Sequence, residues 1–162
     1  MAFGTGTHET TSLCLRLMEK YIGNAEAGKV LDVGCGSGIL SIAAAVMGCE
    51  QVLAVDIAED AVRTAEENIR INGVADTVQA VQGDLIKGID FKADMIVANL
   101  MAELVVMLSE SAMAHMKKGG IFISSGILTE KRDMAVEAIK KAGFKIEEVV
   151  EDGEWCAVAA RA

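Results

Sequence analysis

Three glycines at alternate positions form the most distinctive short motif of the chain. The stretch "LDVGCGSG" places Gly34, Gly36 and Gly38 directly after a short apolar, β-branched run. Glycine lets a backbone turn tightly and approach a ligand without side-chain interference. A dinucleotide-binding turn has the spacing G-x-G-x-x-G, which requires glycine at position 39, where Ile39 stands. The motif therefore predicts a turn beside a nucleotide-like ligand that lacks a pyrophosphate, with a plain tight turn as the alternative.

Two carboxylates follow strands that we expect further along the chain. Asp56 ends the apolar run "QVLAVD", 22 residues after Gly34. A carboxylate at this place can accept hydrogen bonds from both hydroxyls of a ribose. Its alternative role is to complement the dipole at the start of a helix. Asp84, in "QGD", stands where a purine amino group would reach, and an ordinary turn aspartate is the alternative.

A carboxamide and a threonine-rich opening supply further polar groups. Asn99 closes "DMIVAN", and its side chain can accept a hydrogen bond from an amine and donate one to a carboxylate, with an ordinary strand-end turn residue as the alternative. The stretch "FGTGTHETT" holds four threonines and precedes the first helix that we expect. We predict that it is a loop belonging to a binding site. His8 within it is more often a surface or positioning residue than an acid–base catalyst.

Sequence patterns typical of helices and of strands alternate along the chain and would position these groups. The spacing of apolar residues predicts helices over 11–22, 37–47, 58–69, 102–116 and 129–142. Buried strands are predicted at 29–34, 51–56, 77–84, 93–99 and 119–126, followed by a hairpin that turns at Asp152-Gly153. This order predicts a doubly wound α/β fold with a mostly parallel sheet and a C-terminal antiparallel hairpin. Its ligand should lie beyond the carboxyl ends of the strands.

Composition limits the classes of function. The chain has 162 residues, the size of one domain, and a net charge of −9, which argues against a nucleic-acid surface and is compatible with a basic protein partner. The four cysteines have no paired spacing, so we expect buried thiols in a reduced, cytoplasmic setting and no metal site. No leader or lipidation signal is recognisable, and the apolar runs are too short to span a membrane.

Taken in order, these motifs resemble the class I S-adenosylmethionine-dependent methyltransferases. The stretches "GTGTHETT", "LDVGCGSGILSIAA", "VDI", "VAN", "SGIL" and "GEW" together resemble the bacterial ribosomal-protein methyltransferase (PrmA) family, which modifies protein eleven of the large ribosomal subunit. The resemblance covers essentially the whole chain and implies a seven-stranded sheet. It also implies that residues 1–162 are the catalytic domain alone, without the family's amino-terminal substrate-docking domain.

The resemblance assigns roles to individual residues. It implies S-adenosyl-L-methionine as cofactor, contacted by Thr11, Gly34, Asp56 and Asn99, and we add Gly36 and Asp84 from their positions in the motifs. The threonine-rich opening would form one wall around the methionine end. Asn99 would also orient the acceptor amine, which the family implies to be a lysine side chain or chain terminus of a basic ribosomal protein. We expect a monomer without direct nucleic-acid or membrane contacts.

Other functions remain open from the sequence alone. A stand-alone methyltransferase for another amine would share every motif. A cofactor-binding domain that is inactive without its docking domain would do so as well. A dinucleotide oxidoreductase shares the fold and the acidic strand end, and only the glycine spacing counts against it. Preference for a nicotinamide dinucleotide over S-adenosylmethionine would identify that class.

Overall fold

A single seven-stranded sheet organises the chain in a computed structural model that describes residues 7–24 and 28–162. The strand order is β3-β2-β1-β4-β5-β7-β6, in which β1 to β5 are parallel and β7 is antiparallel to both β5 and β6. The strands are β1 Lys29–Val33, β2 Gln51–Asp56, β3 Val78–Gln82, β4 Ala93–Asn99, β5 Met116–Leu128, β6 Lys145–Asp152 and β7 Trp155–Arg161.

Helices cover both faces of this sheet. Buried residues of α1, α2 and α3 form one core cluster with one face, and those of α4 and α5 form a second cluster with the other. The helices are α1 Thr7–Asn24, α2 Ile39–Val46, α3 Glu59–Ile71, α4 Ala102–Ala112 and α5 Arg132–Lys141, with short 3₁₀ turns η1 Met113–His115 and η2 Thr129–Lys131. The predicted doubly wound α/β fold with a terminal antiparallel hairpin is confirmed.

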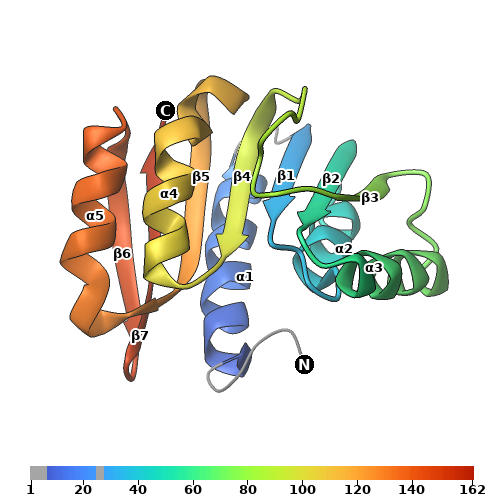
Figure 1. The fold of residues 1–162 in the computed structure, drawn as a ribbon, viewed down its shortest axis with the longest axis horizontal. Coiled ribbons are helices and arrows are strands. Elements are labelled where there is room, and N and C mark those ends of the chain that lie inside the picture. Colours follow the sequence, from blue (N-terminus) through green and yellow to red (C-terminus); the bar gives the residue numbers. More distant parts are fainter. Residues whose placement is uncertain (1–6, 25–27) are drawn as a thin grey trace.

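The carboxyl ends of the central strands meet at one edge of the sheet. In Figure 1 the arrowheads of β1, β2 and β4 point to the same edge, and α1 begins beside it. Ligands of open α/β sheets bind at this edge, where the order of strands reverses on either side of the first strand. Here β2 and β4 flank β1, so the reversal lies between β1 and β4.

The opening stretch is helical where the structure describes it. We predicted a loop over Phe3–Thr11, of which residues 3–6 lie outside the described residues. From Thr7 onward the chain is already in α1, so the loop prediction is wrong there. The apolar stripe extends one turn further back than apolar residues alone reveal, because Thr10 is buried at 3% exposure, three and four residues before buried Leu13 and Cys14.

The helix predicted over 102–116 is shorter than expected. It ends at Ala112, continues as the 3₁₀ turn η1, and gives way to β5 at Met116, which pairs with Ala93 of β4. His115 helps to fix this end, because its two ring nitrogens lie 3.0 Å from the carbonyl oxygens of Ser111 and Ile89. By contrast, β2 and β4 have the predicted bounds.

The structure also describes the helices and the cysteines in terms of membrane crossing and burial. No helix within 7–24 and 28–162 combines the length and apolar character that a membrane crossing requires. All four cysteines are buried free thiols. Burial raises the pKa of the Cys14 and Cys35 thiols well above the usual range, so both stay protonated and act as small apolar side chains.

Candidate functional site

The glycine turn after β1 is bonded directly to the end of β2. The N–H groups of Gly34 and Cys35 both donate to the Val55 carbonyl, at 2.8 and 2.9 Å. The N–H of Gly36 donates to Asp56 Oδ2 at 2.9 Å, and the N–H of Ala58 donates to Asp56 Oδ1 at 2.9 Å. Two backbone amides therefore hold the Asp56 carboxylate in one orientation beside the turn.

Gly34 has a structural reason to be glycine. Its φ is +74°, and a Cβ built there would lie 2.5 Å from Cδ2 of Leu100. Leu100 is the residue after Asn99, so its side chain packs onto the bare backbone of the turn. This contact joins the β1–β2 part of the site to the end of β4.

Asn99 and Thr11 are brought together although 88 residues separate them. The Asn99 Nδ2 group donates to Thr11 Oγ1 at 3.4 Å, from the end of β4 to the start of α1. Asn99 is 4% exposed, and its Oδ1 atom is buried without a hydrogen-bond partner among the described residues. A buried acceptor left open is uncommon in native structures, so this atom is a candidate ligand contact.

Asp84 and His8 are both exposed side chains, one in the turn after β3 and one in α1. The N–H of Gly83 donates to the Asp56 carbonyl at 2.9 Å, which places the turn after β3 beside Asp56. The Asp84 carboxylate is exposed and contacts Lys87 Nζ at 3.3 Å. His8 is exposed in the first turn of α1. The roles predicted for both residues stay predictions.

One acidic residue inside the glycine motif was not among the predicted site residues. Asp32 of β1 is fully buried, and Ser41 Oγ donates to its Oδ2 at 2.7 Å. Its Oδ1 has no partner in the described part of the chain. Burial raises the pKa of Asp32 to about 7 and the charge of Asp56 adds to the rise, against the hydrogen bonds from Ser41. The sequence feature that could have identified Asp32 is its place in "LDVGCGSG", where an acidic residue interrupts an apolar run.

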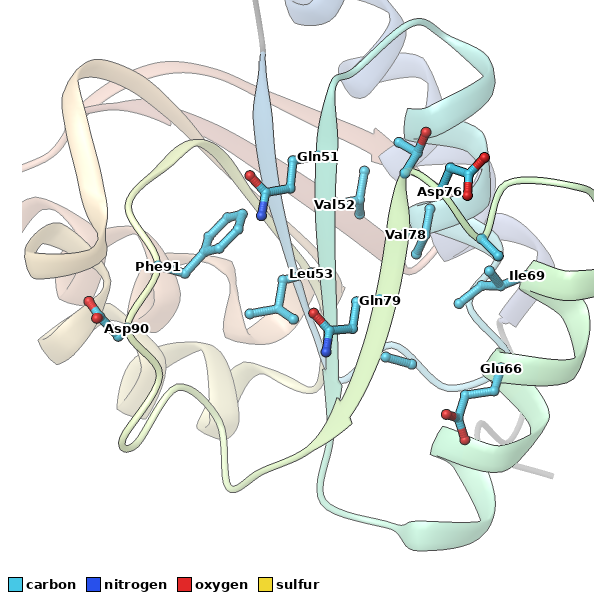
Figure 2. A pocket seen from close by; sticks show the side chains of 13 residues that line it. Gln51, Val52, Leu53, Glu66, Ile69, Asp76, Val78, Gln79, Asp90 and Phe91 are labelled. Carbon is cyan, nitrogen blue, oxygen red and sulfur yellow. The ribbon is translucent and has the colours of Figure 1, made fainter.

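A hollow elsewhere on the molecule does not match this site. It has a volume of about 690 Å³ and wraps around the edge strand β3 (Figure 2). Val78 and Ile69 lie on one side of the strand, whereas Gln79, Leu53 and Phe91 lie on the other. Because successive strand residues face opposite sides of a sheet, these side chains do not converge on one ligand.

The described residues offer no ready metal site. No three His, Cys, Asp or Glu side chains gather within 7–24 and 28–162 in a way that could hold an ion. The polar groups that do converge are the Asp56 carboxylate, the glycine turn and the Asn99–Thr11 pair. They lie at the carboxyl edge, where the fold predicts the ligand.

Comparison with known proteins identifies the family. A family model described as "Ribosomal protein L11 methyltransferase (PrmA)" matches residues 1–162. The chain is 45% identical over 161 residues to a ribosomal protein L11 methyltransferase of Clostridium botulinum (strain Eklund 17B / Type B) and 47% identical over 161 residues to one of Bacillus cereus (strain ATCC 10987 / NRS 248). Each alignment covers 99% of this chain but 50% and 51% of those relatives, so the chain spans about half of their length.

A solved structure agrees with both comparisons. The crystal structure of a ribosomal protein L11 methylase from Lactobacillus delbrueckii subsp. bulgaricus superposes with a TM-score of 0.91 at 35% identity. The match covers 96% of this chain and 79% of that one. The fold is that of the class I methyltransferases, as the motifs predicted. The chain belongs to the ribosomal protein L11 methyltransferase (PrmA) family.

Proposed function

We propose that this chain is an S-adenosylmethionine-dependent protein N-methyltransferase domain whose substrate is ribosomal protein L11. The observation that carries the proposal is the meeting of a backbone-held carboxylate, Asp56, with a glycine turn and the Asn99–Thr11 pair at one edge of the sheet. Relatives that share 45% and 47% of their aligned residues carry the substrate in their names.

The residues at the carboxyl edge fit the cofactor. Asp56 keeps acceptor capacity for two ribose hydroxyls, since each of its oxygens accepts one backbone hydrogen bond and has further lone pairs. The bare backbone at Gly34 allows close approach. The open Oδ1 of Asn99 and the hydroxyl of Thr11 suit the charged groups of the methionine end. We assign Gly36 to holding Asp56 in place and Asp84 to the adenine amino group.

When bound, S-adenosylmethionine supplies a methyl group already activated by a positively charged sulfur. The task of the protein is therefore to bring an acceptor amine into line and to keep water out of that line. An attacking amine must be neutral with its lone pair free. Asn99 can direct that lone pair by accepting an N–H of the amine at Oδ1, and the displaced proton leaves through solvent. No covalent nucleophile is required of the chain.

The acceptors we propose are lysine side chains and chain termini. The net charge of −9 favours encounter with a basic ribosomal protein through long-range attraction. We further propose that residues 1–162 form the catalytic domain of the family and act as a monomer in the cytoplasm, where ribosomal proteins are made.

Calorimetric titration tests the cofactor assignment. We expect saturable binding of S-adenosylmethionine and of its demethylated product S-adenosylhomocysteine, and no binding of a nicotinamide dinucleotide. A methyl-transfer assay with purified ribosomal protein L11 and radiolabelled S-adenosylmethionine then tests the substrate. Binding without transfer to this protein would contradict the substrate assignment, and preference for the dinucleotide would contradict the cofactor.

A further inference from the structure

Ser125 of β5 bonds to both chain segments that supply the Asn99–Thr11 pair. It is fully buried and stands opposite Asn99 in the parallel β4–β5 register. Its Oγ donates to the carbonyl of Thr10 at 2.7 Å, and its own carbonyl accepts the N–H of Leu100 at 2.9 Å. Ser125 thus holds the residue before Thr11 and the residue after Asn99.

The lengths of these bonds indicate which contact positions the helix. The direct Asn99–Thr11 bond is 3.4 Å long, at the weak end of the hydrogen-bond range, whereas the Ser125–Thr10 bond is 2.7 Å and buried. The first turn of a helix has little support of its own, because its N–H groups lack intrahelical partners. Docking of this turn on the sheet therefore depends more on Ser125 than on Asn99.

The glycine that follows Ser125 allows β5 to lie close to Asn99 and Leu100. Gly126 has φ +84°, and a Cβ at this position would lie 2.8 Å from both Asn99 Oδ1 and the carbonyl oxygen of Leu100. The pair Ser125-Gly126 thus packs directly against the end of β4.

We propose that Ser125 is a positioning residue that places Thr11 against Asn99 and thereby sets the affinity for the methionine end of the cofactor. This inference rests on the proposed function. Ser125 itself is bonded to Thr10 and Leu100, so its effect on the cofactor is exerted through the neighbours of Thr11 and Asn99. It should change recognition of the amino-acid part of the cofactor and leave recognition of the nucleoside unchanged.

The adjacent serine offers a matched control. Ser124 is also fully buried, but it faces the opposite side of the sheet and its Oγ has no hydrogen-bond partner in the ranges that the structure describes. Ser124→Ala and Ser125→Ala each remove one buried oxygen from neighbouring positions. Only Ser125→Ala removes a bond to α1.

The experiment compares two ligands by calorimetry. S-adenosylhomocysteine has the amino-acid group, and 5′-methylthioadenosine keeps the nucleoside and sulfur without it. We expect Ser125→Ala to weaken S-adenosylhomocysteine binding about five- to tenfold, as loss of one hydrogen bond implies, with 5′-methylthioadenosine nearly unaffected. Ser124→Ala should change neither. Ser125→Cys, which keeps the shape with a weaker donor, should fall between wild type and Ser125→Ala.

The outcomes separate this inference from the proposed function. Equal weakening of both ligands by Ser125→Ala, or no weakening of either, overturns the positioning role. Ser125→Cys carries the same test should Ser125→Ala fail to fold in a thermal melt. A wild-type chain that binds no S-adenosylhomocysteine overturns the proposed function instead, and the inference with it.

Discussion

The two edges of the sheet differ in whether their polar side chains have hydrogen-bond partners. At the amino edge Asp94 accepts from the N–H of Lys29 at 2.9 Å and from Lys117 Nζ at 3.4 Å. Toward the carboxyl edge, Asp32 Oδ1, Asn99 Oδ1 and Ser124 Oγ are buried without partners among residues 7–24 and 28–162. Each such atom costs about 1–3 kcal/mol of stability. The amino edge thus has its carboxylate paired, whereas unpartnered polar atoms lie toward the carboxyl edge, and of these we propose that Asn99 Oδ1 meets the ligand.

The largest expected effect comes from adding one methyl group at Gly126, near the carboxyl end of β5. Gly126→Ala forces a Cβ to within 2.8 Å of Asn99 Oδ1 and the Leu100 carbonyl at φ +84°. We expect it to lower the free energy of unfolding by about 3 kcal/mol and to abolish S-adenosylhomocysteine binding. Urea unfolding and calorimetry measure the two effects.

Gly119→Ala is the matched change at the amino edge. Gly119 has a similar φ of +81°, but a Cβ there meets no heavy atom of the described residues within 4 Å. It should cost only about 1–2 kcal/mol from backbone strain and leave ligand affinity unchanged. Equal losses of affinity in the two variants would break the contrast between the edges.

The next largest effect is on ligand affinity, and it should differ between the carboxylates of Asp56 and Asp94. Asp56→Asn removes the charge and one acceptor from the site, so we expect S-adenosylhomocysteine to bind about 10- to 100-fold more weakly. Asp94→Asn removes the charged acceptor of the Lys29 backbone N–H and of Lys117 Nζ at the other edge, and it should reduce stability without changing affinity. Calorimetry on both variants decides, and a comparable loss of affinity in Asp94→Asn would contradict the assignment.

A pH series tests whether ionisation of the buried Asp32 carboxyl destabilises the fold. Burial raises the pKa of this carboxyl from 3.8 in the unfolded chain to about 7 in the fold, so the folded state holds the proton more tightly. Its ionisation therefore destabilises the fold increasingly as pH rises from about 4 to about 7. The free energy of unfolding of Asp32→Asn, relative to that of wild type, should therefore rise by about 2 kcal/mol between pH 5 and pH 8. Urea unfolding of both proteins at pH 5 and pH 8 measures this difference. An equal difference in the free energy of unfolding at the two pH values would disprove the prediction.

The smallest expected effect comes from the ion pair at the amino edge of the sheet. Lys117 and Asp94 form an ion pair at 3.4 Å with side chains 46% and 25% exposed. Because solvent screens such pairs, Lys117→Ala should change the free energy of unfolding by less than about 0.5 kcal/mol. Thermal melts at low and high salt measure the change, and a loss as large as that of Gly126→Ala would show that the amino edge also depends on a few critical contacts.

Local pattern predicted the strands and the order of elements better than it predicted helix ends. The runs 51–56 and 93–99 match β2 and β4, because a buried parallel strand is a continuous apolar run that polar residues terminate. The start of α1 was missed because Thr10 is a polar residue in a buried position. The end of α4 was missed because Met116 fits a helical stripe equally well, and only its pairing with Ala93 places it in β5.

The site could be predicted in part for the same reason. Gly36 and Asp56 stand at the ends of adjacent predicted strands, and the structure bonds them to each other. The family resemblance named Thr11 and Asn99 as separate cofactor contacts, but their hydrogen bond to each other was not predicted. Ser125 was not predicted, since a serine inside "GGIFISSG" carries no local sign that its hydroxyl reaches a helix 115 residues away. Such contacts become visible only when the strand order is known.

The bond between Ser125 and Thr10 also constrains the order of assembly. Ser125 is synthesised 115 residues after Thr10 and must enter β5 beside β4 before the bond can form. Contacts between residues so distant in sequence carry a large loop-closure cost and tend to form late. Helix α1 thus acquires this anchor only after most of the sheet exists, and a chain released before residue 125 would lack this part of the site.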